Sequence, residues 1–247
     1  MRLSAIISHA AFVIFLSLLT QLGGLAWLAA LRFRRRIPAF LLAYCAFWAA
    51  AYAFSPRVAL PCFGEPLRMQ SALYCAMNRH YVTPELASVA MDAASRIATT
   101  YPGTITLALD GSFPFLNGMP MIPHLSHDDG EKLDLAFYYT DAAGTYLPGK
   151  TRSPLGYFAF EMTPPEVCPA NTLTLRWNLG PLQPLWPDRP LDGPRTAALI
   201  RHLAADPRVG KVFVEPPLAA RLGLSDPKIR FQGCRAARHD DHIHIQL

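Results

Sequence analysis

The sequence predicts an α+β domain, built on a small antiparallel sheet with flanking helices and preceded by a two-helix transmembrane hairpin. Three observations support this prediction. The first 54 residues hold two apolar runs and no acidic side chain. The rest of the chain mixes short strand-like segments with helical ones and has few strand–helix–strand repeats, which favours α+β over a doubly wound sheet. This part is also long enough to build one hydrophobic core.

The two apolar runs are candidate membrane-spanning helices. Residues 3–31 are almost continuously apolar, and residues 37–54 form a second run without charge. About 20 apolar residues cross a bilayer, and somewhat shorter runs can also do so. Four of the five arginines in this part lie between the runs, in residues 32–36. The positive-inside rule places this loop in the cytoplasm, so the amino terminus and the chain after Phe54 are predicted outside the inner membrane.

The charge balance bears on the kind of partner. The anchor, residues 1–54, holds five of the 23 basic residues, which leaves 18 basic against 18 acidic residues in the exported part. A neutral domain lacks the basic face that nucleic-acid binding requires. We therefore expect no nucleic-acid partner.

Cysteine usage agrees with an exported domain. Cys45 lies in the second apolar run and is expected to be buried. The other four cysteines form an even set, which predicts two disulfides in an oxidising compartment. Three pairings are possible. We favour Cys62–Cys75, which closes a short loop, together with Cys168–Cys234.

The exported part is predicted to begin with an irregular, disulfide-bearing connector, residues 55–82, and to continue as a domain over residues 83–247. Thr83, Pro84 and Glu85 form a helix-start pattern, because a capping hydroxyl precedes proline and an early acid. This helix should end near Thr100. Short apolar segments predict strands over residues 105–109, 133–139, 156–162 and 173–177.

Proline content shapes the next elements. Residues 181–194 contain so many prolines that neither regular element is expected there, and we predict an ordered surface loop. The elements expected after it are a helix over 195–205, a strand over 211–215, a short helix over 218–222, a strand over 228–232 and a terminal strand over 242–247.

The first cluster of metal-capable side chains lies in residues 123–139. Its members are His124, His127, Asp128, Asp129 and Asp134. Nitrogen and carboxylate ligands without a nearby thiolate suit a catalytic zinc site, in which three protein ligands leave a fourth position for water. The alternative for Asp128 and Asp129 is that they are solvated loop acids.

The second cluster closes the chain as HDDHIHIQL, residues 239–247. The alternation over residues 242–245 places two histidines on one face of a strand and two isoleucines on the other. The isoleucines can then pack into the core while the histidines face a cleft. The alternative is a solvent-facing polar side of an amphipathic strand.

Together the two clusters resemble the signature of a zinc peptidase group. This group comprises the D-Ala-D-Ala peptidases, the penicillin-insensitive murein endopeptidases and the amino-terminal hedgehog domain, and the similarity is greatest to the murein endopeptidases. The matching positions are His124, His127 and Asp134 in an H-x-x-H-x6-D run, and His239, His242 and His244 in an H-x-x-H-x-H run. Residues 212–222 also resemble the strand and helix that precede the closing motif. The membrane hairpin and the connector are not covered.

The resemblance implies a hedgehog/DD-peptidase-like fold with one Zn²⁺ per chain, bound by His127, Asp134 and His244. Two neutral imidazoles and one carboxylate leave the metal with a net positive charge. Such an ion acidifies a bound water to a pKa of about 7 and polarises a peptide carbonyl.

The resemblance also implies roles for the neighbouring residues. It places His242 and His239 at catalytic or transition-state-stabilising positions and His124 at the position of an extra active-site histidine. A histidine beside the metal can accept the proton of the water and deliver it to the leaving amine. Asp240 or Asp241 is expected to orient one of the imidazoles.

One departure from the family pattern concerns substrate binding. Many relatives carry a serine–arginine turn upstream of the first histidine that binds the substrate carboxylate, but residues 109–121 contain no arginine. Arg152, Arg176 and Arg235 are the candidates to replace it. The substrate preference is therefore less well predicted than the metal site.

The sequence favours a membrane-anchored, extracytoplasmic zinc metallopeptidase that cuts peptidoglycan peptides at a D-amino-acid crosslink or stem bond. The bond itself, and the choice between endo- and carboxypeptidase, stay open. The alternative is a hedgehog-like zinc domain that binds wall peptide or a protein partner without cutting it. A non-haem iron oxygenase shares the two-histidine, one-carboxylate set, but the ligand spacing and the compartment argue against it. A regulatory membrane partner on the anchor is a further hypothesis.

Overall fold

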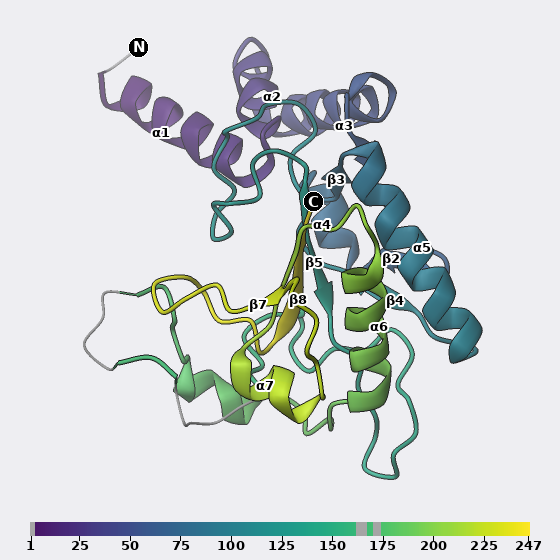
Figure 1. Ribbon diagram of the computed structural model, residues 1–247. Helices are drawn as coiled ribbons and strands as arrows, with labels where there is room; N and C mark the ends of the chain where they lie inside the picture. The colour runs from purple at the N-terminus through teal and green to yellow at the C-terminus, as the bar shows by residue number, and fades with distance from the viewer. Residues whose placement is uncertain (1–2, 162–166, 170–173) are drawn as a thin grey trace.

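The computed structural model describes residues 3–161, 167–169 and 174–247. It has an α+β architecture in which apolar N-terminal helices lie against one end of a mixed α/β body (Figure 1). The body contains a six-stranded mixed sheet and a separate two-stranded antiparallel sheet. The predicted α+β class is therefore confirmed, but the main sheet is mixed and not purely antiparallel.

The main sheet has the strand order β2-β4-β5-β8-β6-β7. Its strands are β2 (Leu67–Met69), β4 (Thr106–Ala108), β5 (Lys132–Ala136), β8 (His242–Gln246), β6 (Lys211–Phe213) and β7 (Ile229–Arg230). The two edge strands run parallel to their neighbours, whereas the inner pairs are antiparallel. In the central pair, Asp134 lies opposite His244 and Leu135 opposite Ile243.

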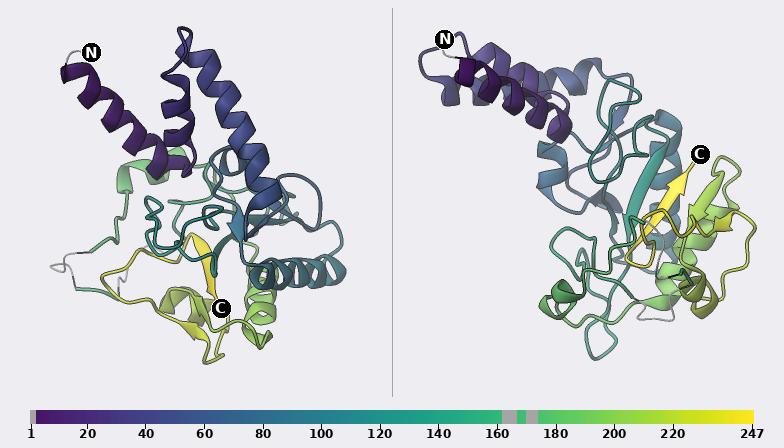
Figure 2. Two further views of the ribbon diagram at one scale, coloured as in Figure 1. Left: turned by 90° about the horizontal axis from the view of Figure 1, so that it is seen from above. Right: turned by 90° about the vertical axis from the view of Figure 1, so that its left-hand side faces the viewer.

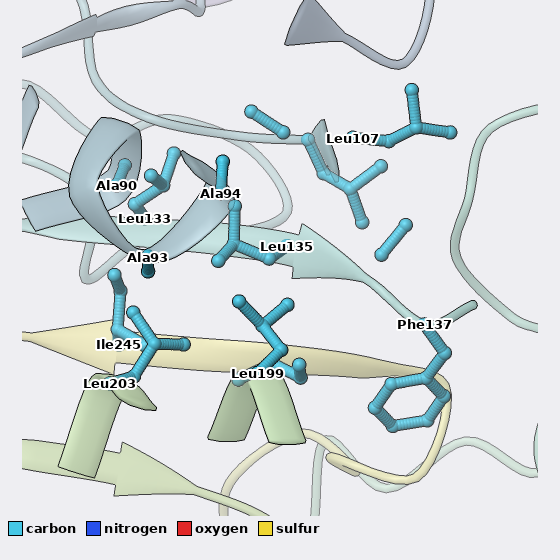
Figure 3. Packing of buried hydrophobic residues seen from close by; sticks show 14 of the residues in the cluster. Ala90, Ala93, Ala94, Leu107, Leu133, Leu135, Phe137, Leu199, Leu203 and Ile245 are labelled. Atoms are coloured by element: carbon cyan, nitrogen blue, oxygen red, sulfur yellow. The ribbon is translucent and has the colours of Figure 1, made fainter. Parts of the chain in front are cut away.

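Two helices cover the apolar face of this sheet, and each begins at a side-chain cap. In α5 (Pro84–Thr100) the Thr83 hydroxyl accepts a hydrogen bond from Leu86 N, as the sequence predicts, and in α6 (Gly193–Ala205) Asp192 accepts one from Arg195 N. Figure 3 shows the packing of residues from both helices on β5 and β8. The labelled residues from these elements are Ala90, Ala93, Ala94, Leu133, Leu135, Leu199, Leu203 and Ile245, all buried. The polar residues of β5 and β8 consequently point to the opposite face.

Residues 55–82 are built into the body and do not form a separate linker. They contain β1 (Val58–Ala59), β2, α4 (Ala72–Ala76) and β3 (Tyr81–Val82). β1 pairs with β3, and β2 forms one edge of the main sheet. The predicted disulfide Cys62–Cys75 lies in this segment and is confirmed.

The segment between β5 and α6 differs most from the predicted elements. Residues 156–161 and 174–177 form no strand, while Met162 and Leu173, which end the two predicted strands, lie outside the described residues. Gly156 and Phe158 have positive φ angles of 82° and 66°, which an extended strand does not tolerate. The predicted proline-rich loop contains a 3-10 helix (Gly180–Leu185). The disulfide Cys168–Cys234, also predicted, ties this segment to the loop before β8.

The sequence predicts one helix for the first apolar run. The structure instead divides this run into α1 (Leu3–Thr20) and α2 (Gly23–Ala30). The chain reverses at Gln21, which has a φ of 64°. A Cβ atom at Gly24 would lie 2.7 Å from Val13 O, so only glycine permits this close approach of α2 to α1. With α3 (Arg36–Phe54), the apolar part therefore holds three helices. Of these, α1 and α3 are long and apolar enough to span a membrane.

The arrangement of these helices also differs from the predicted hairpin. Both views in Figure 2 place the amino terminus and the turn between α2 and α3 at the same end, away from the sheet. Arg36 Nη1 lies 3.3 Å from His9 Nε2 in α1, which holds the arginine turn beside the first helix. The amino terminus is therefore on the side of the arginine turn and not on the side of the domain. Cys45 is exposed on α3 rather than buried.

Acidification is expected to destabilise the protein through His80. This side chain is fully buried, and burial lowers the pKa of its imidazole from 6.5 to about 4. Between these values the unfolded chain binds a proton that the folded protein does not. The stabilisation is complete above pH 6.5 and falls by about 3 kcal/mol as the pH approaches 4. Urea unfolding of the wild type and of His80→Gln at pH 7 and 4.5 measures this effect; an equal pH dependence of both proteins contradicts it.

Candidate metal centre

Three side chains converge on the polar face of the sheet. Asp134 comes from β5, His244 from the opposite position in β8, and His127 from the loop that precedes β5. His244 Nδ1 lies 2.8 Å from Asp134 Oδ1, and His127 Nε2 lies 3.4 Å from that oxygen. The two imidazole nitrogens are 3.2 Å apart. The three residues are buried and form a group that could hold a metal ion. The residues predicted as ligands are thus brought together.

The loop that carries His127 is held by hydrogen bonds to residues 111–112. His127 Nδ1 lies 2.9 Å from Gly111 O, so this nitrogen carries the ring proton and Nε2 keeps its lone pair toward the centre. Ser112 Oγ donates to His127 O at 2.6 Å and accepts from Gly130 N at 3.0 Å. The stretch that lacks the expected arginine, residues 109–121, therefore positions His127, the first of the candidate ligands.

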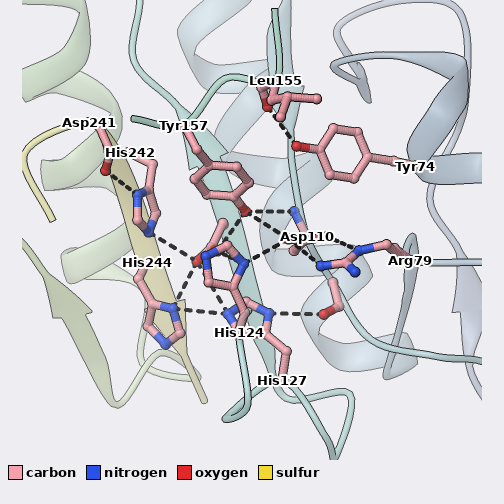
Figure 4. Close-up of polar contacts among 12 residues, drawn as sticks. Tyr74, Arg79, Asp110, His124, His127, Leu155, Tyr157, Asp241, His242 and His244 are labelled. Carbon is pink, nitrogen blue, oxygen red and sulfur yellow. Dashed lines mark hydrogen bonds and ion pairs between the residues drawn. The ribbon is translucent and has the colours of Figure 1, made fainter. Parts of the chain in front are cut away.

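Tyr157 is a site residue that the sequence reading missed. Its hydroxyl donates to Asp134 Oδ2 at 2.7 Å. It also lies 3.3 Å from Asp110 Oδ2, and Figure 4 shows it beside Asp110. Asp110 N donates back to the same hydroxyl at 3.1 Å. Tyr157 thereby holds the carboxylate oxygen that faces away from the two histidines. No sequence signal marks this residue, because it lies in a segment that resembles an ordinary strand.

His124 belongs to a neighbouring network. Its Nδ1 is 2.7 Å from Asp110 Oδ2, and Asp110 is also paired with Arg79 through contacts of 2.6 and 2.8 Å. Burial opposes ionisation of Asp110, but Arg79 and His124 outweigh this effect and hold the pKa of Asp110 well below its usual range. Asp110, His124 and Asp134 form another metal-capable group. The guanidinium on Asp110 disfavours a second cation there, so His127, Asp134 and His244 make the better centre.

His242 lies beside the centre and is held by a carboxylate. Its Nδ1 is 2.5 Å from Asp241 Oδ1, which leaves Nε2 directed at the centre, 3.6 Å from Asp134 Oδ1. Burial opposes its charge, but Asp134 and Asp241 outweigh this effect and raise the pKa of His242 to about 9. Of the two aspartates considered for this role, Asp241 contacts the imidazole, whereas Asp240 forms a two-point pair with Arg238.

His239 completes the histidine group. Its ring centroid lies 4.9 Å from that of His242 and 5.5 Å from that of His244. Burial, reinforced by the two neighbouring histidines, lowers its pKa well below 6.5. Within the described part of the chain its Nδ1 has no hydrogen-bond partner. A buried imidazole nitrogen without a partner is costly, and so favours a ligand or water at this position.

Electrostatics differ among the three candidate ligands. Burial lowers the pKa of His244 to about 4, so this imidazole is neutral near pH 7. Burial also disfavours charge on His127, but the Asp134 carboxylate outweighs it and raises the pKa of His127. Burial likewise opposes ionisation of Asp134, but the nearby histidines hold its pKa well below 3.8. The centre therefore offers an anionic carboxylate beside two imidazoles, a set that a dication would complete.

The arginines proposed to grip a substrate carboxylate are engaged elsewhere or lie at the surface. Arg152 Nη1 lies 3.2 Å from Glu161 Oε1, and Arg176 forms a buried, bidentate salt bridge with Glu215. The Arg235 side chain is exposed. Arg152 and Arg176 are therefore poor candidates for this role.

A third metal-capable group, Cys62, Cys75 and His80, lies outside the centre. Its two cysteines form a disulfide, so their sulfurs are not available as thiolate ligands.

No protein-family model matches the chain, and no curated protein sequence matches it. The function of the centre is therefore inferred from its residues and their geometry.

Replacing Tyr157 with phenylalanine is expected to weaken metal binding about 10- to 100-fold without removing it. The change deletes the hydroxyl that holds Asp134 Oδ2 but keeps the ring, and loss of such an outer partner has costs of this size. Competition with a chromogenic chelator measures the affinity. Tyr138→Phe is the control, because its hydroxyl contacts Thr106 and not the centre. Equal affinities of the two variants contradict the role of Tyr157.

Proposed function

We propose that the chain is a membrane-anchored zinc metallopeptidase that hydrolyses peptidoglycan peptides on the exported side of the inner membrane. The observation that carries this proposal is the convergence of His127, Asp134 and His244, with His242 directed at the same point. The sequence resemblance to the murein endopeptidases and D-Ala-D-Ala peptidases supports it. Under this proposal the domain belongs to the hedgehog-like fold group.

Two of the three separations between the candidate ligand atoms fit zinc, whereas the third, 2.8 Å between His244 Nδ1 and Asp134 Oδ1, is shorter. In a tetrahedral site with bonds of about 2.0–2.1 Å, neighbouring ligand atoms are about 3.3–3.4 Å apart. The two distances from His127 Nε2, to His244 Nδ1 and Asp134 Oδ1, are 3.2 and 3.4 Å. When bound, Zn²⁺ supplies Lewis-acid activation of water and of a peptide carbonyl. Three protein ligands leave one position for these groups.

The histidines that are not ligands would move protons. Asp241 fixes the tautomer of His242, whose Nε2 faces the centre and can exchange a proton with a group bound there. His239 is the second imidazole within reach and is the candidate partner for the developing negative charge. His124 is held by Asp110 and lies on the side of Tyr157, with ring centroids 4.6 Å apart. Under this proposal His124 contacts the substrate.

The apolar helices support the proposed location. The arginine turn lies at the end of the helices that is far from the sheet, so the positive-inside rule puts the turn in the cytoplasm and the domain outside. The two disulfides suit an oxidising compartment. A wall hydrolase endangers its own cell, so control by a membrane partner of residues 1–54 is part of the proposal.

The second candidate function is a zinc domain that binds wall peptide or a protein partner without cutting it. The engagement of Arg152 and Arg176 in internal ion pairs favours it, because a peptidase of this group needs a group that holds the substrate carboxylate. An iron oxygenase is tested by metal analysis of protein purified without added zinc. Tightly held iron without hydrolysis would support that enzyme class.

The decisive experiment incubates the protein with purified cross-linked muropeptides, with and without a chelator, and identifies the products by mass spectrometry. Chelator-sensitive cleavage that is lost in His244→Ala supports the peptidase and names the bond. A folded protein that holds one zinc and cuts nothing supports the binding domain instead.

A further inference from the structure

The arginine turn sets the depth at which α3 would lie in a bilayer. α3 has 19 residues from Arg36 to Phe54, a length of about 28 Å that matches a hydrocarbon core of roughly 30 Å. Charged side chains are costly at the bilayer centre, so the turn belongs at one lipid–water interface and Phe54 at the other. This placement rests on the membrane anchor of the proposed function, and not on its peptidase activity.

Side chains in the second half of α3 form hydrogen bonds with α4, which belongs to the exported part of the chain. Tyr44 Oη donates to Ala76 O at 2.6 Å, and Trp48 Nε1 donates to Cys75 O at 2.9 Å. Tyr44 precedes Phe54 by about 15 Å along the helix, which is half of the hydrocarbon core. With α3 across the membrane, α4 and its disulfide-bonded neighbours therefore lie at the depth of the outer leaflet.

The surface at this depth is apolar and hollowed. Phe63 is 76% exposed and Leu73 is 49% exposed. A cavity of about 790 Å³ lies between α3 and the segment that contains α4, and every residue described as lining it is uncharged. Its volume is within the range of about 300–1,000 Å³ that is usual for small-molecule sites.

The polar atoms of the aromatic lining residues already have partners within the protein. Besides the bonds of Tyr44 and Trp48, the hydroxyl of Tyr52 lies 3.0 Å from His80 Nε2. The cavity therefore presents ring faces and methyl groups. A polar occupant would lose hydrogen bonds to water without replacing them, whereas a hydrocarbon chain loses none. At leaflet depth the neighbouring molecules with such chains are the membrane lipids themselves.

We propose that this α3–α4 cavity holds one acyl chain of an outer-leaflet phospholipid. The cavity begins beside Tyr52, near the exported end of α3, and extends along the helix to Tyr44. An acyl chain descends from a headgroup at that interface in the same direction. The bound lipid would fix the depth of the exported body relative to the membrane surface.

The test uses the full chain, extracted in mild detergent after incubation with vesicles of phosphatidylethanolamine and phosphatidylglycerol. Native mass spectrometry is expected to find one phospholipid retained per chain. Ala72→Phe fills the cavity and should abolish retention. Ala46→Phe is the matched control, because Ala46 is exposed on α3, which also borders the cavity, but is not a described lining residue. Retention that is equal in both variants, or absent in the wild type, overturns the proposal.

A second measurement does not depend on how well the variants are extracted. Vesicles with chains brominated near their middle should quench Trp48 fluorescence in a protein whose other three tryptophans are phenylalanine. The quenching should fall in Ala72→Phe and persist in Ala46→Phe. Equal quenching in the two variants overturns the lipid site. A dimer of the protein in which a second copy, and no lipid, covers the cavity overturns it as well. If alkaline carbonate releases the wild-type protein from membranes, the membrane anchor itself is refuted. The peptidase activity is tested independently, by the muropeptide cleavage assay.

Discussion

Asp134→Asn is expected to abolish metal binding while leaving the protein folded. Oδ1 of this carboxylate lies within 3.4 Å of both candidate ligand nitrogens, and its negative charge is the only one in the triad. Asparagine keeps the shape but removes the charge that offsets a dication. Metal analysis should find one zinc per wild-type chain and almost none in the variant. Cleavage of muropeptides, if present in the wild type, should be lost as well.

The control for this prediction is Asp129→Asn. Asp129 is half-exposed, contacts Lys132 and lies in the loop next to the candidate ligands. The Asp129→Asn variant should keep its zinc. This result would support the interpretation of Asp129 as a solvated loop acid that does not bind the metal. Added zinc should raise the melting temperature of the wild type and of Asp129→Asn but not that of Asp134→Asn. Full zinc occupancy of Asp134→Asn would refute the assigned centre.

The strand pattern explains why the sequence could predict so much of this centre. Alternation of histidine and isoleucine in β8, and of aspartate between leucines in β5, defines one polar and one apolar face for each strand. The apolar faces meet α5 and α6, so the polar faces must meet on the other side. The pairing of Asp134 with His244 requires only the register between the two strands.

The residues that support the centre could not be predicted in this way. Tyr157 reaches Asp134 from the segment after β5, and Arg79 holds the neighbouring Asp110 from the segment before β4, so both contacts depend on how these segments fold over the sheet. Likewise, the break of the first apolar run depends on the packing of α2 against α1 at Gly24. Composition shows that such a run is apolar, but not where the chain turns back.

Glu215→Ala is expected to destabilise the protein by about 3–5 kcal/mol, because it leaves Arg176 buried without its counter-charge. Both side chains are buried, and two hydrogen bonds of 2.8 and 2.9 Å join them. Glu215 also accepts from the backbone N of His239 at 3.1 Å. The variant should therefore lose the position of His239 together with stability, and activity should fall more than the unfolded fraction alone explains.

The matched control for Glu215→Ala is Asp92→Ala, which breaks the exposed pair between Asp92 and Arg208. Exposed pairs contribute about 0–1 kcal/mol, since water solvates the charge that remains. Urea unfolding monitored by circular dichroism gives both free energies under the same conditions. A destabilisation by Glu215→Ala as small as that of Asp92→Ala would mean that water reaches Arg176 in the folded protein. The buried pair would then not be what holds the loop before β8, and the position of His239 would depend on the other contacts of this loop, which include the hydrogen bond from Glu215 N to His239 O and the disulfide Cys168–Cys234.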